Sequence, residues 1–212
     1  MFSRILLSFI AMFTTTSALA AKQIDKTQPY QMMKEVAEVT FERLKAEQDT
    51  IKQDPNELKV IVEEELMPYV NYRYAALKLL GPNLKGAKRE DVGEFITAFR
   101  AYLVTSYAQV LTQYSDQKIQ FGPEVKLDPS KRITSIKVDI IEAPRPNIKL
   151  EFKLRKDKKS GEWQAFDMVA EGISLLSSKQ AEWNSTIRQK GILVAAKDLE
   201  KLAAQPIRFE AK

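Results

Sequence analysis

The spacing of hydrophobic residues changes near the middle of this chain. In the first half, apolar residues recur every three or four positions, which is the spacing of one face of an α-helix. Pro29 suits the first turn of a helix, and Gly81–Pro82 is typical of a helix end. The pattern predicts helices at residues 29–44, 54–68, 69–80 and 88–114, the last with a wide aromatic stripe.

The spacing then becomes that of β-strands, with apolar and polar residues in strict alternation. Residues 148–155 alternate without a fault, and similar runs cover residues 135–140 and 162–169. A short edge strand is expected at residues 118–121. The links are short, so we expect an antiparallel sheet with one apolar and one polar face. Helices return between Gly172 and Gly191 and over residues 193–204.

These elements predict an α+β fold in which the long aromatic helix covers the apolar face of the sheet. A sheet of about four strands wrapped by helices forms a cone. The cone is either filled by its own side chains or encloses a pocket, and both arrangements use the same residue types. Periodicity alone favours the filled core.

The first residues have the pattern of an export signal. Arg4 provides the positive charge, an apolar stretch of about nine residues follows, and Ala18–Ala20 forms a small-x-small cleavage site. The stretch is shorter than the ~20 residues that a membrane-spanning helix needs. We therefore expect a signal peptide at residues 1–20 and a single, exported mature domain at residues 21–212.

Composition excludes several kinds of chemistry. The chain contains no histidine and no cysteine, so it has no imidazole base, no disulfide and no zinc or haem site built on these ligands. Cleavage after Ala20 removes Arg4 and lowers the formal charge from +5 to +4. This excess is too small and too dispersed to indicate nucleic-acid binding. Composition leaves carboxylate chemistry and calcium sites open, but we expect no metal and no cofactor.

Two polar groupings could indicate chemistry, but each has a simpler interpretation. Asp167, Glu171 and Ser174 lie where the last strand meets a helix, and Lys179 could form a Ser–Lys pair. A serine nucleophile needs an adjacent base, and this arrangement is more typical of a helix N-terminus. The basic residues at positions 153–159 are typical of a solvated strand face, the alternative being contact with phosphate head groups or an acidic partner.

Several strings resemble the MlaC family of periplasmic phospholipid-binding proteins. The longest, GEWQAFDMVAEGIS, covers residues 161–174. The others lie at residues 28–30, 41–45, 64–70, 99–103, 138–141 and 179–183, in the family's order along the whole mature chain.

The resemblance implies an NTF2-like fold with added helices that enclose an apolar pocket for acyl tails. It implies a soluble, monomeric carrier that is not an enzyme and that maintains the lipid asymmetry of the outer membrane. The implied partners are glycerophospholipid, an outer-membrane lipoprotein–porin complex and an inner-membrane ABC transporter with an MCE-domain ring. The alternative is an NTF2-like structural adaptor of a periplasmic complex, without lipid.

The resemblance also implies where the lipid lies. The implied tail-binding residues on helices are Tyr69, Tyr72, Leu79, Phe99, Tyr102 and Leu103. Those on the sheet are Val138, Ile140, Leu150, Phe152, Leu154, Trp163, Phe166, Met168 and Val169. Arg100, Arg145 and Lys149 are candidates for charge-assisted contacts with the head group at a wet mouth.

Overall fold

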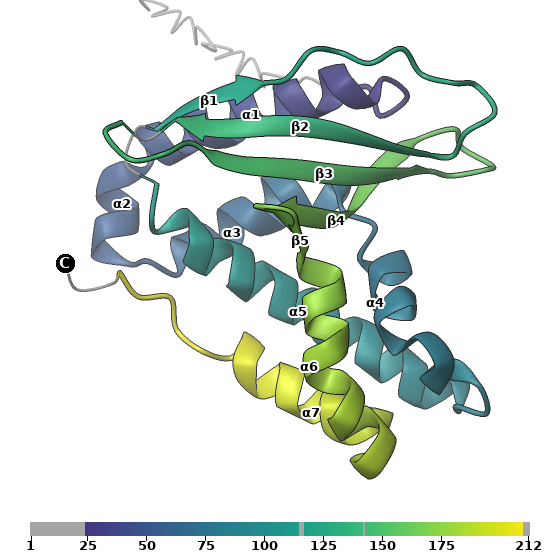
Figure 1. Ribbon diagram of the computed structural model, residues 1–212. Helices are drawn as coiled ribbons and strands as arrows, with labels where there is room; N and C mark the ends of the chain where they lie inside the picture. Colours follow the sequence, from purple (N-terminus) through teal and green to yellow (C-terminus); the bar gives the residue numbers. More distant parts are fainter. Residues whose placement is uncertain (1–23, 115–116, 142, 210–212) are drawn as a thin grey trace, which may run out of the picture.

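The computed structural model describes residues 24–114, 117–141 and 143–209, so the expected signal peptide lies outside the described residues. A twisted sheet forms one part of the molecule, and a group of helices forms the other (Figure 1). The α-helices of the described chain are α1 (Pro29–Ala46), α2 (Gln48–Gln53), α3 (Glu57–Ile61), α4 (Tyr72–Leu80), α5 (Arg89–Leu111), α6 (Leu175–Lys190) and α7 (Ile192–Ala203).

The sheet is an antiparallel meander in the order β1-β2-β3-β4-β5. Its strands are β1 (Lys118–Phe121), β2 (Ile133–Ile141), β3 (Ile148–Lys156), β4 (Trp163–Ala170) and β5 (Ile173–Ser174). This confirms the α+β class and the antiparallel sheet, with five strands where about four were expected. The additional strand, β5, has two residues and pairs with the end of β4. It is too short to produce an alternation in the sequence.

The register defines the two faces of the sheet. Directly opposite residues of an antiparallel pair point to the same side, and Ile136 lies opposite Phe152 while Val138 lies opposite Leu150. The face that these residues share is called the apolar face below. Its apolar members in β2, β3 and β4 are Ile136, Val138, Ile140, Ile148, Leu150, Phe152, Leu154, Trp163, Ala165, Met168 and Ala170, and Thr134 and Lys156 lie on the same face near Leu154 and Trp163. The opposite, polar face carries Lys137, Asp139, Glu151 and Lys153.

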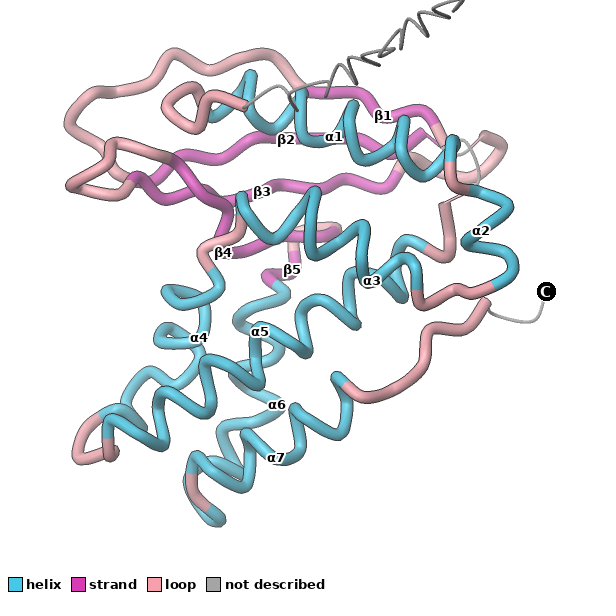
Figure 2. The backbone as a smooth tube through the Cα atoms, turned by 180° about the vertical axis from the view of Figure 1, so that it is seen from behind, coloured by secondary structure: helices cyan, strands magenta, loops and turns pink. Residues whose placement is uncertain are grey.

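Three apolar clusters stabilise the fold. The sheet cluster joins the apolar face to the first half of α1 through Met32 and Val36. The basal cluster joins the second half of α1 to α2, α3 and α5, and includes Leu44 and Ala108. The helical cluster joins α4, α5, α6 and α7 around the fully buried Phe95. Seen from behind, α1 crosses the sheet and then continues toward α2 and α3 (Figure 2).

The segment between α3 and α4 separates the two helices that the sequence predicts at residues 54–68 and 69–80, and it is less regular than predicted. A π-helical turn, η1 (Val62–Leu66), is followed by a short 3-10 turn, η2 (Met67–Tyr69). The chain is then extended at Val70, which bridges to Ala165 of β4. The Asn71 side chain accepts a hydrogen bond from the Tyr74 backbone N–H and thereby caps α4. Pro68 and the strand contact thus separate two helices that share one apolar pattern.

Candidate functional site: a wedge on the apolar face

One end of the apolar face is tightly closed. Leu154, Trp163 and Ile136 are 0%, 3% and 6% exposed, and they pack against Met32 and Val36 of α1. The Trp163 backbone N–H donates to the Lys26 carbonyl oxygen at 2.7 Å, so the N-terminal segment covers the β4 edge at this end. This closed end is an ordinary hydrophobic core.

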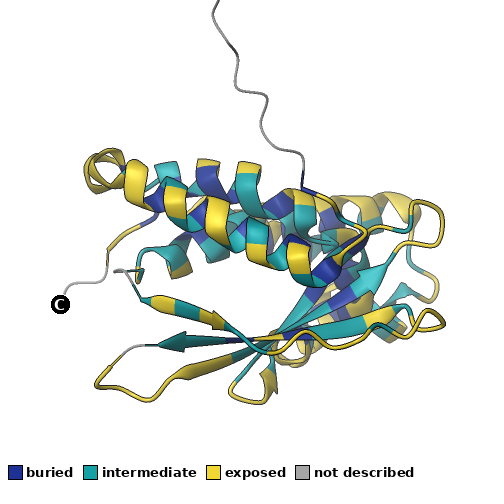
Figure 3. Ribbon diagram, turned by 90° about the horizontal axis from the view of Figure 1, so that it is seen from above, coloured by how far each residue is buried: buried dark blue, intermediate teal, exposed yellow. Residues whose placement is uncertain are grey.

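The same face becomes progressively more exposed toward the β2–β3 hairpin. Ile140, Leu150 and Met168 are half-buried, and Ile148 is 38% exposed. On β5, Ile173 continues the row opposite Ala170 and is 61% exposed. Figure 3 shows the strands changing from buried to exposed away from the helices. An apolar surface that the protein leaves half-covered is suited to an apolar ligand.

The helices diverge from the sheet at this open end. The first half of α1 contributes Met32 and Val36 to the sheet cluster, whereas Leu44 near its end belongs to the basal cluster. Leu66 of η1 contacts both clusters and therefore lies where the two layers separate. The apolar face is thus covered at Trp163 and only half-covered toward Ile148, and this graded apolar surface is called the wedge below.

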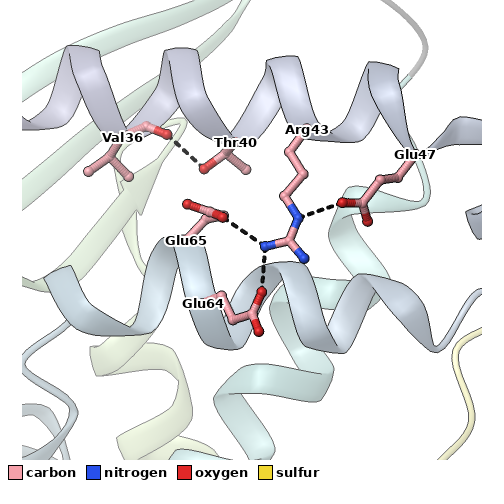
Figure 4. A network of polar contacts seen from close by, with 6 residues as sticks. All are labelled: Val36, Thr40, Arg43, Glu47, Glu64 and Glu65. Atoms are coloured by element: carbon pink, nitrogen blue, oxygen red, sulfur yellow. Dashed lines mark hydrogen bonds and ion pairs between the residues drawn. The ribbon is translucent and has the colours of Figure 1, made fainter. Parts of the chain in front are cut away.

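An ionic network fixes the helical side of the wedge. Arg43 on α1 donates hydrogen bonds to Glu47, Glu64 and Glu65 at 2.8, 2.6 and 2.7 Å (Figure 4). Burial alone would lower the pKa of Arg43, but the hydrogen bonds to Glu64, Glu65 and Glu47 outweigh it, and the pKa is raised above its ordinary value. Since Glu64 and Glu65 belong to η1, Arg43 connects α1 to the π-helical turn.

The remaining acidic residue of η1, Glu63, extends this connection to α5. Glu63 pairs with Arg100 at 2.6 Å, and the Arg100 guanidinium lies 5.4 Å from the centre of the Tyr72 ring. The three consecutive glutamates of η1 thus connect α1 and α5 through opposite charges. The sequence contains the glutamates, but nothing in it predicts the π-helical turn that directs them to two different helices.

Tyr107 on α5 is a residue of the basal cluster that sequence reasoning did not select as a candidate site residue. Its ring packs against the basal cluster, yet its side chain is only half-buried. Burial, and then the negative charge of Asp167 on β4, raises the pKa of the Tyr107 hydroxyl to about 12. Tyr107 lies on the side of α5 that carries Leu103 and Leu111, which also pack against the basal cluster. Its place in the apolar stripe gave no signal of a special role.

The tail-binding residues inferred from the resemblance lie in two separate places. One group belongs to the sheet cluster, and it comprises Tyr69, Val138, Leu150, Phe152, Leu154 and Trp163. Ile140 and Met168 are half-buried on the apolar face of β2 and β4, whereas Val169 lies opposite Glu151 and therefore on the polar face, away from the other predicted tail-binding residues of the sheet. The second group packs in or against the helical cluster, and it comprises Tyr72, Leu79, Phe99, Tyr102, Leu103 and Phe166.

Phe166 joins the helical cluster because of an irregularity in β4. The register between β3 and β4 shifts at Lys153/Leu154, and Phe166 is the residue left without a partner. Such a bulge turns a side chain away from its alternating position. Phe166 consequently packs edge-on against Tyr74 of α4 at 5.0 Å between ring centres.

The three candidate head-group residues are also separated. Arg145 and Lys149 lie exposed in or beside the β2–β3 hairpin, at the open end of the wedge. The Lys149 backbone N–H donates to the Glu171 carboxylate at 2.6 Å, which ties the hairpin to the β4–β5 turn. Arg100 instead pairs with Glu63, as described above.

The polar residues at the β4–α6 junction cap a helix. The Ser174 hydroxyl donates to Asp167 at 2.8 Å and accepts from the Ser177 backbone N–H at 3.0 Å, as an N-cap residue does. Asp167 also accepts the Leu176 backbone N–H at 3.1 Å. This supports the interpretation of the serines as a helix N-terminus.

Two hollows lie outside the wedge. A cavity of about 20 Å³ near Tyr30 and Leu127 has room for roughly one water molecule. A shallow hollow along α6, lined by Asn184 and Arg188, is open and polar. Among residues 24–114, 117–141 and 143–209, no acidic cluster forms a metal site, and no helix is long and apolar enough to cross a membrane.

Comparison with known proteins shows the family. Residues 34–201 match the family model described as MlaC protein. The chain is 40% identical over 202 residues to the intermembrane phospholipid transport system binding protein MlaC of Haemophilus influenzae, covering 94% of each. It is similar, with a TM-score of 0.71 and 15% identity, to a phospholipid-binding protein of Ralstonia solanacearum solved with a phospholipid, covering 85% of this chain and 98% of that one. This chain belongs to the MlaC family.

Proposed function

We propose that this protein is a soluble phospholipid carrier that shelters acyl tails in the wedge on its apolar face. The gradient of exposure carries the proposal: one sheet face passes from fully buried Leu154 to 38% exposed Ile148 without a polar residue replacing the apolar ones. In a filled hydrophobic core the whole face would be covered, whereas the half of this face near Ile148 is not. The relative from Haemophilus influenzae, named as a phospholipid transport binding protein, supports the same conclusion.

The energetics explain why a carrier is needed. A phospholipid in water exposes some thirty methylene groups at about 0.8 kcal/mol each, or on the order of 20 kcal/mol. Leu150, Phe152 and Met168 offer the tails an apolar surface, while the charged head group stays in water beyond Ile148. Burial of the head group would incur a large desolvation penalty. The carrier therefore distinguishes head groups weakly.

The proposal includes the biological setting that the family implies. The chain is exported to the periplasm, carries lipid between an outer-membrane lipoprotein–porin complex and an inner-membrane ABC transporter with an MCE-domain ring, and performs no chemical step. The sequence has no phosphate-binding glycine motif, so the partners or their nucleotide hydrolysis set the direction of transport.

Native mass spectrometry of the protein purified from membrane-containing cells tests this proposal. We expect about one bound phospholipid with two intact tails per chain. Lipid extraction of the same sample distinguishes the rivals: hydrolysed products would indicate an enzyme. A folded protein that co-purifies with partners but never with lipid would indicate a structural adaptor and contradict the carrier.

A further inference from the structure

The Arg155 guanidinium on β3 is held by an aromatic ring and has no acidic partner. It lies 4.4 Å from the centre of the Tyr74 ring, and Tyr74 in turn packs edge-on against Phe166. Within residues 24–114, 117–141 and 143–209, the Arg155 side chain forms no hydrogen bond or ion pair, whereas Arg43 pairs with three carboxylates. A stacked guanidinium keeps its N–H donors at the edge of its plane, where they can meet an anionic group.

Other cations lie near Arg155, on the side of the sheet away from the wedge. Arg155 lies opposite Ile133 of β2, on the polar face. Lys153 precedes it by two residues on the same face and is partly exposed. Lys78 is exposed and lies one turn after Tyr74 on the same side of α4. The side chains of Arg155, Lys153 and Lys78 are called the basic patch below.

The acidic residues of the polar face do not neutralise the basic patch. Asp167 is 6% exposed and already accepts a hydrogen bond from the Ser174 hydroxyl at 2.8 Å. The Lys153 ammonium lies 3.9 Å from Asp167, which is near the outer limit of an ion pair. Glu151, the next residue of β3 on this face, lies opposite Lys137. The basic patch therefore keeps a net positive charge.

The make-up of the basic patch favours a protein partner over a membrane surface. Segments that bind anionic membranes carry about four to eight clustered basic residues, which is more than this patch offers. Arginine and tyrosine are instead enriched among the residues that dominate protein interfaces. The exposed Ile133 adds an apolar contact beside Arg155. The fork of N–H donors on a guanidinium matches the two oxygens of a carboxylate.

We propose that the basic patch docks an acidic segment of a partner protein, and that Arg155 binds an aspartate or glutamate carboxylate of this segment through both oxygens. The inference goes beyond the proposed function and does not depend on it. Because the patch and the wedge lie on opposite faces of the sheet, the protein can hold such a partner while its apolar face stays free. Failure of the inference would leave lipid binding untouched.

Fluorescence anisotropy with a labelled acidic peptide tests the inference. The peptide alternates glutamate with serine, so it offers the wedge no apolar side chain, and its control has glutamine in place of glutamate. We expect the wild-type protein to bind the glutamate peptide at least about tenfold more tightly at low salt. Arg155→Gln should lower this affinity about tenfold. Arg188→Gln removes the same charge from the exposed surface of α6 and should bind as the wild type does.

A second variant distinguishes a fixed docking site from general attraction between charges. Tyr74→Leu keeps every cation of the basic patch and removes the ring beneath Arg155. We expect the affinity for the glutamate peptide to fall about threefold, with the fold retained in circular dichroism. Unchanged affinity in Tyr74→Leu would overturn the fixed site.

Three further outcomes would also overturn the inference. The first is a wild-type protein that binds the two peptides equally. The second is an equal loss of affinity in Arg155→Gln and Arg188→Gln, which would indicate attraction by net charge alone. The third is sedimentation with phosphatidylglycerol vesicles that depends on Arg155 while the glutamate peptide does not bind, which would assign the basic patch to a membrane surface.

Discussion

The two ends of the apolar face have the same composition and opposite surroundings. At the closed end, Leu154 and Trp163 are covered by α1, and at the open end Leu150 and Ile148 are not. The difference arises from α1, which packs on the sheet through Val36 and then turns to the helices through Leu44. Whether an apolar strand residue is core or binding surface is therefore set by a distant helix.

The largest expected effect is a loss of stability at the closed end. Leu154 is fully buried, so Leu154→Ala should lower the free energy of unfolding by about 3 kcal/mol through lost burial and a new cavity. Denaturant unfolding of the delipidated protein measures this directly. A loss below about 1 kcal/mol would contradict the division of the face into two ends.

At the open end, substitution should affect lipid more than stability. Leu150→Arg introduces a charge onto the proposed tail-binding surface, and we expect lipid occupancy to fall at least about tenfold. Ile133→Arg is the matched control, since Ile133 is 51% exposed on the opposite face of the same two strands. Native mass spectrometry compares the two variants. Equal lipid loss in both variants, with folding intact, would contradict the proposal that the apolar face binds the lipid.

Substitution of Arg43 tests whether its ion pairs hold α1 against η1 beside the wedge. Arg43→Gln leaves Glu64 and Glu65 without their cation, and the connection between α1 and η1 weakens. We expect a stability loss of about 1 kcal/mol, because Glu64 is 56% exposed and solvent screens the pair. Lipid transfer to acceptor vesicles should become faster. Lys52→Gln, which removes an exposed ion pair to Asp49, is the control and should change neither quantity. Slower lipid transfer in Arg43→Gln would contradict the idea that the Arg43 ion pairs restrain release of the lipid.

The smallest effect is a spectroscopic one. The pKa of Tyr107 is raised to about 12, so its neutral form is favoured by folding. The corresponding stability is complete below the ordinary tyrosine pKa near 10 and is lost as the pH rises through about 12. Absorbance titration should show an ionisation near pH 12 in the wild-type protein that is missing from Tyr107→Phe. A titration unchanged by this substitution would place Tyr107 in a solvated position.

The sequence predicted the elements whose pattern is local. Residues 148–155 alternate without a fault and form β3, and the stripe at residues 88–114 forms α5, which ends at Leu111. The expected helix starting near Asp54 begins at Glu57, because Asp54 instead ends the unexpected helix α2. These differences concern helix ends, where the local signals are weakest.

Local patterns could not predict which of the candidate tail-binding residues lie on the sheet and which lie in the helical cluster. Phe166 follows the alternation of β4 in the sequence, but the bulge directs it toward Tyr74 and the helical cluster. Tyr72, Leu79 and Phe99 are as apolar as the sheet residues, and only tertiary packing places them in the helices' own core. Periodicity shows which residues avoid water, and it does not show what covers them.

Photo-crosslinking tests the central claim most directly. A benzophenone side chain is introduced at position 150 or, separately, at position 133, and the lipid-loaded protein is irradiated. The wedge predicts covalent attachment of an acyl chain at position 150 and none at position 133. Crosslinking at position 133 with none at position 150 would show that the tails do not lie on the apolar face, and would contradict the account.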